Sequence, residues 1–272
     1  MQIIQNMNCR TAFSKKQQDD LYSLEDQSWW FQYRARVIIG LTDHFLKKEK
    51  LTLDIGGGNG YTTAQLKESG YEVGLIEPSA EACRHAAHRG ISKVYCGVID
   101  KDNTADGSIE QMMLLDVLEH IEDDEEFLRL LCQKAARGGI LLMTVPAYMC
   151  LWSSEDCAAG HFRRYKEKQL SVLVRKAGFE VVFSSYFMSF LFLPILLVRV
   201  GMEKVGLLKK YEERTETERE KIAEKQFKST NRIINRILNF VQLTELGKLR
   251  RLRKVRFGSS IIMILRKTAA GG

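Results

Sequence analysis

The sequence of 272 residues has no C-x-x-C pair, although it contains six cysteines, at positions 9, 83, 96, 132, 150 and 157. The spacing of these cysteines matches no zinc-binding pattern, so no metal centre of that kind is expected. Residues Met1 to Lys16 include no apolar core of the length that a secretory signal requires. These absences predict reduced thiols and a cytoplasmic protein.

A membrane-spanning run is also lacking. The longest apolar run, Tyr186 to Val198, has 13 residues, is interrupted by Pro194 and ends at Arg199. A helix that crosses a bilayer needs about 20 apolar residues. The run is therefore predicted to be buried in the protein or to lie at an interface.

Positive charge is scarce in the first two thirds of the chain and abundant in the last third. Residues 1–180 carry 22 Lys and Arg against 26 Asp and Glu, whereas residues 181–272 carry 19 against 8. The whole chain is 45% apolar and 28% charged, which excludes disordered and fibrous classes. A basic segment usually faces phosphate, nucleic acid or an anionic membrane, so the last third is predicted to contact such a partner.

Short apolar runs alternate with amphipathic stretches from residue 51 onward. The runs predict strands at Leu51–Ile55, Glu72–Ile76, Lys93–Cys96, Gln111–Leu115, Ile140–Val145 and Phe179–Ser184. The intervening stretches predict helices at Tyr61–Glu68, Ala80–Arg89, Asp123–Ala136 and Lys168–Ala177. This order predicts an α/β fold with a doubly wound parallel sheet, and a last run, Ser260–Leu265, predicts an edge strand.

Two helical regions flank this alternating core. Apolar residues recur at three- and four-residue steps over residues 14–48, so an N-terminal helical region is predicted there. An insertion of about 75 residues precedes the last strand, which is far longer than an ordinary connection between strands. It contains the apolar run, a stretch from Lys209 to Lys225 with 12 charged residues in 17, an amphipathic segment with Ile233, Ile234, Ile237, Leu238 and Val241 on one face, and a basic segment from Lys248 to Arg256. The insertion is either a helical subdomain with a solvated charged face or a binding surface.

A glycine-rich loop follows the first predicted strand, in the order Asp54-Ile55-Gly56-Gly57-Gly58-Asn59-Gly60. Glycines allow a sharp turn close to a ligand, and the following helix supplies free N–H groups. Position 61, where the dinucleotide fingerprint requires glycine, is Tyr61, and no P-loop lysine is present. A carboxylate two positions before the first glycine suits a ligand with a cationic end, such as an amino acid.

Glu77 ends the second predicted strand, 23 residues after Asp54. In a doubly wound sheet this position lies beside the glycine loop, where a carboxylate can accept two ribose hydroxyls. The alternative is a solvated glutamate in a turn before Pro78.

Taken together, these motifs resemble those of class I S-adenosylmethionine-dependent methyltransferases. The resemblance rests on acid-x-Gly-x-Gly-x-Gly, on the acid that closes the second strand, and on Asp116-Val117-Leu118-Glu119-His120 after the fourth strand. It covers residues 50–185 and implies a Rossmann-like seven-stranded sheet with an antiparallel last strand. A bacterial subgroup has Trp-Trp-Phe-x-x-Arg before the first strand, here Trp29 to Arg34, and Val-Pro-Ala followed by His-x-Arg-Arg-Tyr, here Val145 to Ala147 and His161 to Tyr165.

The resemblance implies S-adenosyl-L-methionine as the cofactor and divides the chain into an N-terminal helical lid (1–49), a cofactor-binding core (50–185), a basic and apolar helical insertion (186–258), and a last strand with its tail (259–272). The residues it assigns to the cofactor are Arg34, Asp54, Gly56, Gly58, Asn59, Gly60, Glu77, Pro78, Asp100 and Asp116. Within this set, Asp116 is expected near the methionine amine and Arg34 near its carboxylate.

Two positions depart from the pattern. Val98 stands where an adenine-facing acid is usual, which leaves Asp100 as a displaced candidate, and Gln111 replaces an acid at the start of the fourth strand.

The loop after the fifth strand is predicted to carry the chemistry, because catalytic groups gather at the carboxyl ends of parallel strands. His161 is the candidate general base, with Tyr165 as a second catalytic candidate, and a structural role for His161 in the loop is the alternative. Arg163 and Arg164 are candidates for holding an anionic group of the acceptor, although either can instead form a surface ion pair. Trp152 and Trp30 are further acceptor-binding candidates, and the aromatic residues 29–31 can equally pack in the core.

The Asp116-x-x-Glu119-His120 arrangement is similar to that of metal-assisted quinone O-methyltransferases. The same residues occur in methyltransferases without a metal, and hard cations need more oxygen ligands than this segment supplies. We therefore expect no metal.

The predicted activity is methyl transfer to a small-molecule or lipid-linked acceptor, with oxygen as the favoured acceptor atom. The apolar run and the basic segments allow peripheral contact with an anionic inner membrane face. The alternatives are an RNA methyltransferase that uses the basic C-terminal region, and a non-catalytic cofactor-binding module that recruits a partner. No Asn/Asp-Pro-Pro-aromatic motif and no Pro-Cys nucleophile motif is present, which disfavours RNA.

Overall fold

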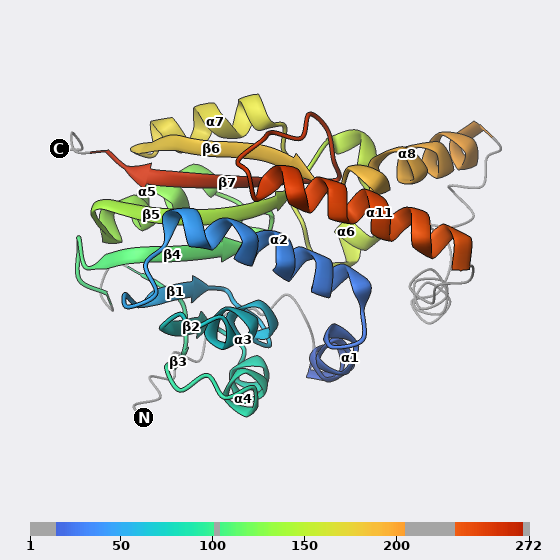
Figure 1. Ribbon diagram of the computed structural model, residues 1–272. Helices are drawn as coiled ribbons and strands as arrows, with labels where there is room; N and C mark the ends of the chain where they lie inside the picture. Colours follow the sequence, from blue (N-terminus) through green and yellow to red (C-terminus); the bar gives the residue numbers. More distant parts are fainter. Residues whose placement is uncertain (1–14, 101–103, 205–231, 269–272) are drawn as a thin grey trace.

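The computed structural model of the chain describes residues 15–100, 104–204 and 232–268 (Figure 1). Its centre is a seven-stranded sheet with the strand order β3-β2-β1-β4-β5-β7-β6. The strands are β1 (Thr52–Ile55), β2 (Val73–Glu77), β3 (Val94–Cys96), β4 (Ile109–Leu115), β5 (Ala135–Pro146), β6 (Phe179–Phe187) and β7 (Ser260–Lys267). The sheet confirms the predicted Rossmann-like α/β fold, since β1 to β5 pair in parallel and β7 runs antiparallel to both of its neighbours.

The position of β7 corrects one expectation. Ser260–Leu265 was expected at an edge of the sheet, but β7 lies between β5 and β6 and pairs with both. The physical reason is the composition of the strand, since Ile261 to Leu265 are five consecutive apolar residues. A strand of this kind is buried when helices cover both faces of the sheet and a strand pairs with each of its edges, and all five residues are fully buried. The edge strand is β6 instead.

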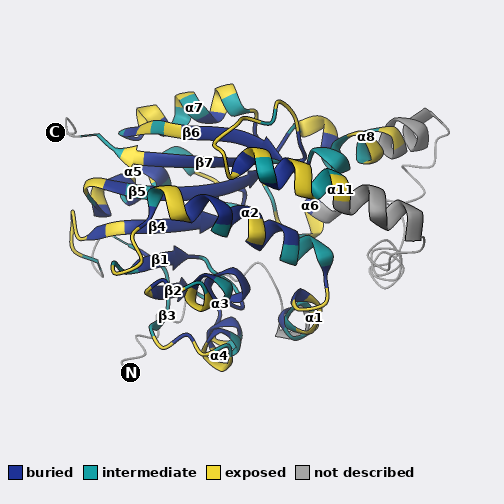
Figure 2. Ribbon diagram, viewed as in Figure 1, coloured by how far each residue is buried: buried dark blue, intermediate teal, exposed yellow. Residues whose placement is uncertain are grey.

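Helices cover both faces of the sheet. They are α1 (Lys15–Glu25), α2 (Trp29–Phe45), α3 (Tyr61–Glu68), α4 (Ala80–His88), α5 (Asp124–Lys134), α6 (Ser154–Ala158), α7 (Glu167–Lys176), α8 (Ser189–Lys204) and α11 (Arg232–Leu249), with short 3₁₀ helices η1 (Leu118–His120) and η2 (Met149–Leu151). Alternate residues of β7 enter two different cores. Met263 belongs to the core that includes the buried residues of α5 and α7, and Ile262 belongs to the core that includes those of α2, α3 and α11. The period of two along a strand thus separates two buried layers (Figure 2).

The predicted N-terminal helical region is interrupted. Ser28 separates α1 from α2, and its side-chain oxygen accepts a hydrogen bond from the backbone N–H of Trp30. A serine in this position stabilises a helix start, because it satisfies one of the N–H groups that have no partner within the helix. Two helices therefore form within the N-terminal helical region that the periodicity predicts.

The insertion before β7 contributes α8 and α11, which pack against each other (Figure 1). The carboxylate of Glu245 on α11 is buried and accepts hydrogen bonds from the hydroxyl of Tyr33 (2.6 Å) and from the backbone N–H groups of Met188 (2.7 Å) and Ser189 (2.9 Å). It thereby joins α2 and the start of α8 to α11. The charge-dense stretch from Lys209 to Lys225 lies outside the described residues. Within the described ranges, no helix has the length and apolar character needed to cross a bilayer.

One cysteine pair differs from expectation. Cys83 of α4 and Cys96 of β3 form a disulfide, with their Cα atoms 6.1 Å apart, whereas the sequence predicted six reduced thiols. Because α4 packs against β3, two positions 13 residues apart are brought within bonding range. Of the other cysteines, the structure describes Cys132, Cys150 and Cys157, and all three are free.

Candidate active site

The glycine loop connects β1 to α3 at the carboxyl edge of the sheet. Gly56, Gly58 and Gly60 have positive φ angles of 70°, 54° and 75°. A Cβ atom on Gly58 would have no neighbour within 4 Å, so open space lies directly beside the backbone there. The loop therefore has the left-handed turns and the exposed backbone that a closely bound ligand requires.

Glu77 ends β2 beside this loop. Its carboxylate accepts hydrogen bonds from the backbone N–H of Gly58 (3.0 Å) and of Ser79 (2.9 Å). The residue is 8% exposed, and burial raises the pKa of its carboxyl group. Glu77 is thus a fixed, buried acid and not a solvated turn residue. Pro78 follows it and is half-buried.

Asp100 belongs to the connection after β3, three residues beyond Gly97, and is half-buried. It precedes residues 101–103, which lie outside the described ranges. Its assignment to the adenine end of the cofactor stays a prediction.

Arg34, Asp116 and Asp54 come together from three elements. The guanidinium of Arg34 on α2 lies 2.7 Å from the carboxylate of Asp116, which follows β4 and has a positive φ of 56°. The hydroxyl of Thr144 on β5 donates to the same carboxylate at 3.0 Å. A non-glycine residue in the left-handed region is strained, and such strain is typical of functional sites.

Asp54 is 1% exposed and accepts a hydrogen bond from the hydroxyl of Thr63. Its second carboxylate oxygen, Oδ1, has no hydrogen-bond partner. Burial raises the pKa of Asp54 to about 6, while the hydrogen bond from Thr63 and the charge of Arg34 act in the opposite direction. An unpartnered buried oxygen is costly, which makes this atom a candidate for binding a donor group of a ligand.

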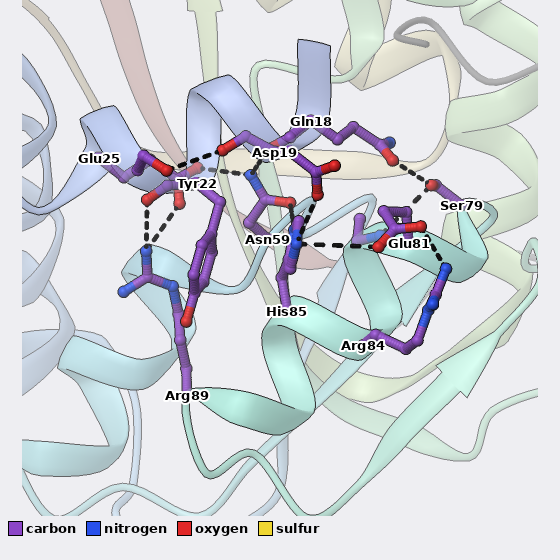
Figure 3. Close-up of polar contacts among 12 residues, drawn as sticks. Gln18, Asp19, Tyr22, Glu25, Asn59, Ser79, Glu81, Arg84, His85 and Arg89 are labelled. Atoms are coloured by element: carbon purple, nitrogen blue, oxygen red, sulfur yellow. Dashed lines mark hydrogen bonds and ion pairs between the residues drawn. The ribbon is translucent and has the colours of Figure 1, made fainter. Parts of the chain in front are cut away.

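The N-terminal helix α1 closes over the glycine loop (Figure 3). Asn59 is buried, and its side-chain amide donates to Glu25 (3.3 Å) while its oxygen shares a 2.9 Å hydrogen bond with His85 of α4. Glu25 in turn forms a 3.0 Å ion pair with Arg89, and burial raises the pKa of Glu25 to about 7. Asn59 was predicted to contact the cofactor, and the structure places its side chain in this network.

The loop after β5 is organised by Asp156, which is buried. Its carboxylate accepts hydrogen bonds from His161 Nδ1 (2.8 Å) and from Arg164 at both oxygens (2.8 and 2.9 Å). Burial acts to raise the pKa of Asp156, but the hydrogen bonds from His161 and Arg164 outweigh it and hold that pKa well below the usual range. Asp156 is therefore an ionised, buried anchor for two predicted site residues.

Two other predicted residues of this loop lie against α5. Tyr165 is buried and donates to the carboxylate of Asp124 at 2.9 Å, and burial raises the pKa of its hydroxyl. Arg163 forms a 2.8 Å ion pair with the same Asp124. The structure thus joins Tyr165 and Arg163 at the start of α5, and joins His161 and Arg164 at Asp156.

The two predicted tryptophans lie on different elements. Trp30 is on α2, where its ring stacks with the guanidinium of Arg34 at 5.6 Å. Trp152 follows η2 and is half-buried. Their assignment to acceptor binding stays a prediction.

His120 connects the two parts of the site. Its ring packs edge-on against that of His161, with centroids 4.6 Å apart, and burial lowers the pKa of His120 to about 4. The neighbouring Glu119 is 1% exposed, its Oε2 has no hydrogen-bond partner, and burial raises its pKa well above the usual range. Ligand atoms of Glu119, His120 and His161 lie within 4.8 Å of one another, so these three residues could hold a metal ion. The sequence missed this grouping, because His161 is 41 residues away from His120 in the chain.

Comparison with known proteins assigns this arrangement to a family. Relatives from Caulobacter, both named ubiquinone biosynthesis O-methyltransferase, are 29% identical over 97 residues in strain K31 and 31% identical over 102 residues in C. vibrioides. These matches span 34% and 35% of this chain and 38% and 40% of the relatives, so they cover about two fifths of the relatives' length.

A solved structure, phosphoethanolamine N-methyltransferase 2 of Haemonchus contortus in complex with S-adenosyl-L-methionine, has the same fold with a TM-score of 0.60. It is 15% identical, and the match covers 98% of this chain and 60% of that one. The profile of the family described as Methyltransferase domain matches residues 30–183, which is more than half of the chain. The chain therefore belongs to the methyltransferase domain family, and it shares the fold of that solved structure.

Proposed function

We propose that this methyltransferase transfers the methyl group to an oxygen atom of a small-molecule or lipid-linked acceptor, with His161 as the general base. The observation that carries the proposal is the hydrogen bond between His161 Nδ1 and the ionised, buried Asp156. An imidazole held in this way presents its other nitrogen, Nε2, as a proton acceptor. The two relatives named ubiquinone biosynthesis O-methyltransferase support oxygen as the acceptor atom.

The residues of the glycine loop fit the cofactor. The open space beside Gly58, the unpartnered Oδ1 of Asp54 and the buried carboxylate of Glu77 all lie on this edge of the sheet. Glu77 would hold the ribose hydroxyls, and Asp54, Asp116 and Arg34 would hold the amino-acid end. The bound cofactor would supply an activated methyl group on a sulfonium sulfur, and that sulfur would leave as a neutral thioether when the methyl group passes to the acceptor oxygen.

The chain's own residues have to remove the acceptor proton and keep the reacting groups aligned. As the acceptor oxygen bonds to the methyl carbon, its proton passes to His161 Nε2. The carboxylate of Asp156 then stabilises the imidazolium, since it remains ionised and accepts the hydrogen bond from Nδ1. Arg164 completes this arrangement, because its two hydrogen bonds fix both oxygens of Asp156.

The test compares His161→Gln and Asp156→Asn with His88→Gln, an exposed histidine on α4. A catechol and a primary amine serve as acceptor probes, and S-adenosylhomocysteine release is measured with each. We expect both site variants to lower kcat with the catechol by about 100-fold or more while the affinity for S-adenosylmethionine is unchanged. The His88→Gln variant should behave as the unaltered protein does.

Full kcat in His161→Gln would show that this histidine only supports the loop. Methylation of the amine but not of the catechol would overturn oxygen as the acceptor atom. The assignments at the cofactor are tested separately by calorimetry, where Glu77→Ala and Asp54→Ala should lose measurable binding of S-adenosylmethionine.

Removal of metal ions separates the base mechanism from a metal-assisted one. After dialysis against a chelator, the rate with the catechol should be unchanged, because His161 needs no metal to accept a proton. A lost rate that Mg²⁺ or Zn²⁺ restores would instead assign Glu119, His120 and His161 to a metal site and reject the proposed role of His161.

A further inference from the structure

The first half of helix α8 is apolar on every side and has no fully covered face. All eight residues from Phe190 to Leu197 are apolar, and none of them is buried (Figure 2). Leu193 is 54% exposed and Leu197 is 69% exposed. A helix that is hydrophobic all round normally lies in a protein core or in lipid, so this helix is expected to have a partner outside the described chain.

Helix α11, which packs against α8, adds further apolar surface. Phe240 is 72% exposed and Leu243 is 64% exposed, while Leu246 and Leu249, nearer the end of the same helix, are buried. Single exposed apolar side chains are common, but here four large ones lie on two helices that pack against each other, and apolar surface of this extent is typical of interaction sites. We call Leu193, Leu197, Phe240 and Leu243 the apolar patch.

The inner side of α8 is anchored next to the active site, which fixes the orientation of the patch. Phe190 packs against the rings of Trp29 and Tyr33 on α2. Phe192 packs against Tyr148 in the loop after β5 and against Phe257. The two phenylalanines hold the helix to the body of the enzyme, and Leu193 and Leu197 remain directed to the outside.

A row of cations begins at the end of α11 and leads back to α8. The exposed basic residues of this segment are Lys248, Arg250, Arg251, Arg253, Lys254 and Arg256. Among the described residues, Lys254 forms an ion pair, at 3.6 Å with Glu167, and no acid lies within ion-pair distance of the other five. The segment ends at Phe257, which is 44% exposed and touches Phe192. A positive rim therefore adjoins an apolar surface.

We propose that the apolar patch and the basic segment 248–256 together dock this enzyme on an anionic phospholipid bilayer. The apolar side chains would enter the boundary between headgroups and acyl chains, and the cations would contact lipid phosphates, so that the two contributions add. A row of six exposed cations, of which Lys254 alone forms an ion pair with an acid among the described residues, fits a negatively charged lipid surface better than an apolar partner protein. The surface reaches the loop after β5 through Phe192 and Tyr148, which places the active site beside the bilayer.

This inference goes beyond the proposed acceptor chemistry and can be tested without it, because lipid binding needs no turnover. The test is co-sedimentation of the full chain with vesicles of phosphatidylcholine and phosphatidylglycerol, compared with vesicles of phosphatidylcholine alone. The protein should sediment with the anionic vesicles, and added salt should weaken the binding.

Single substitutions locate the surface. Leu193→Ser and Leu197→Ser should each weaken binding to anionic vesicles by roughly tenfold, and Arg251→Gln and Arg253→Gln by about fivefold each. The matched controls are Val172→Ser, an exposed apolar residue on α7, and Arg137→Gln, an exposed cation at the start of β5. Calorimetric binding of S-adenosylmethionine reports for every variant that the fold is intact.

Three results would overturn the proposal. The first is that the unaltered protein does not sediment with anionic vesicles. The second is that the leucine variants bind them as well as the control variants do. The third is evidence of an occupant other than lipid: either Leu197→Ser converts a dimer to a monomer in analytical ultracentrifugation, or the arginine variants lose binding to single-stranded RNA and keep binding to vesicles.

Discussion

Gly60 closes the glycine loop in a conformation that only glycine adopts without strain. Its φ angle is +75°, and a Cβ atom would lie 2.7 Å from the side chain of Ile91 and 2.9 Å from that of Ala86. The position therefore combines a left-handed backbone with a close approach between the loop, α4 and the segment before β3.

We expect Gly60→Ala to lower the free energy of unfolding by about 2–4 kcal/mol, of which the left-handed backbone accounts for about 1–2 kcal/mol. Gly107→Ala is the control, since Gly107 has a φ of +67° but open space around its Cβ position. Urea unfolding of both variants measures the difference. If both variants lose the same free energy of unfolding, the close approach of Ala86 and Ile91 to the added methyl group contributes nothing.

His120 gives a pH dependence with a definite sign. Its pKa is about 4 in the fold and 6.5 in the unfolded chain, because burial disfavours the imidazolium. Between these two values the unfolded chain binds the proton and the folded protein does not. Stability is therefore lost as the pH falls from 6.5 to 4, by up to about 3 kcal/mol from this group.

The variant His120→Gln lacks this group, so its free energy of unfolding should fall less than that of the unaltered protein between pH 6.5 and 4. His88→Gln, at an exposed position, controls for the loss of any histidine. Urea unfolding at several pH values measures the slopes. Parallel curves for His120→Gln and the unaltered protein would contradict the burial effect.

At the scale of single elements, α1 depends on a few polar contacts for its position. Arg89 lies on the connection after α4, pairs with Glu25 and packs over the ring of Tyr22 at 4.4 Å. Gln18 accepts a hydrogen bond from Ser79 at 2.6 Å (Figure 3). Because Ser79 also donates its N–H to Glu77, this helix covers both the glycine loop and the acid that ends β2.

Removing the guanidinium in Arg89→Ala should loosen α1, since Glu25 then loses its buried partner. Amide hydrogen exchange over residues 15–25 should become faster by about tenfold or more, which corresponds to about 1.4 kcal/mol. Arg84→Ala is the matched control on α4, because Arg84 is largely exposed and pairs with Glu81 on the surface. Unchanged exchange in Arg89→Ala would mean that the apolar contacts alone hold the helix.

At the scale of the whole molecule, β7 joins the edge strand β6 to the rest of the sheet. It forms hydrogen bonds with β5 and β6 along its length, and its residues from Ile261 to Leu265 are fully buried. Each such side chain contributes about 1.5–3 kcal/mol to stability when it is buried. The five buried side chains together therefore contribute a free energy comparable to the net free energy of unfolding of a whole domain.

A chain that ends after Gly258 should therefore fail to fold, because β5 and β6 would both be left with an unpaired edge. A chain that ends after Thr268 keeps all of β7 and should show the thermal midpoint of the full chain. Circular dichroism on heating compares the two. A cooperative transition in the shorter chain would show that β6 pairs with β5 directly.

The charge of the molecule is also a matter of this scale. The excess of Lys and Arg after residue 180 lies outside β1, β2 and β4, beside which the cofactor is proposed to bind. Much of the described part of this excess is the exposed segment 248–256. The acidic first two thirds hold the residues proposed for the cofactor, and the basic last third holds the surface proposed for lipid. Composition alone indicated this division, and the exposure of the individual cations supports it.

The sequence by itself determined the features that depend on local order. The alternation of strands and helices, the glycine loop and the acid that ends β2 were all predicted, because turns, caps and the period of two in strands act over a few residues. The family followed from the same motifs.

Only the tertiary structure decided which distant residues meet. It placed β7 between β5 and β6, joined Cys83 to Cys96, paired Arg34 with Asp116, and grouped His161 with Asp156 and His120. Each of these contacts joins segments whose approach is set by strand order and loop closure. No local periodicity encodes that order, because it is selected by the burial of complete faces of the sheet.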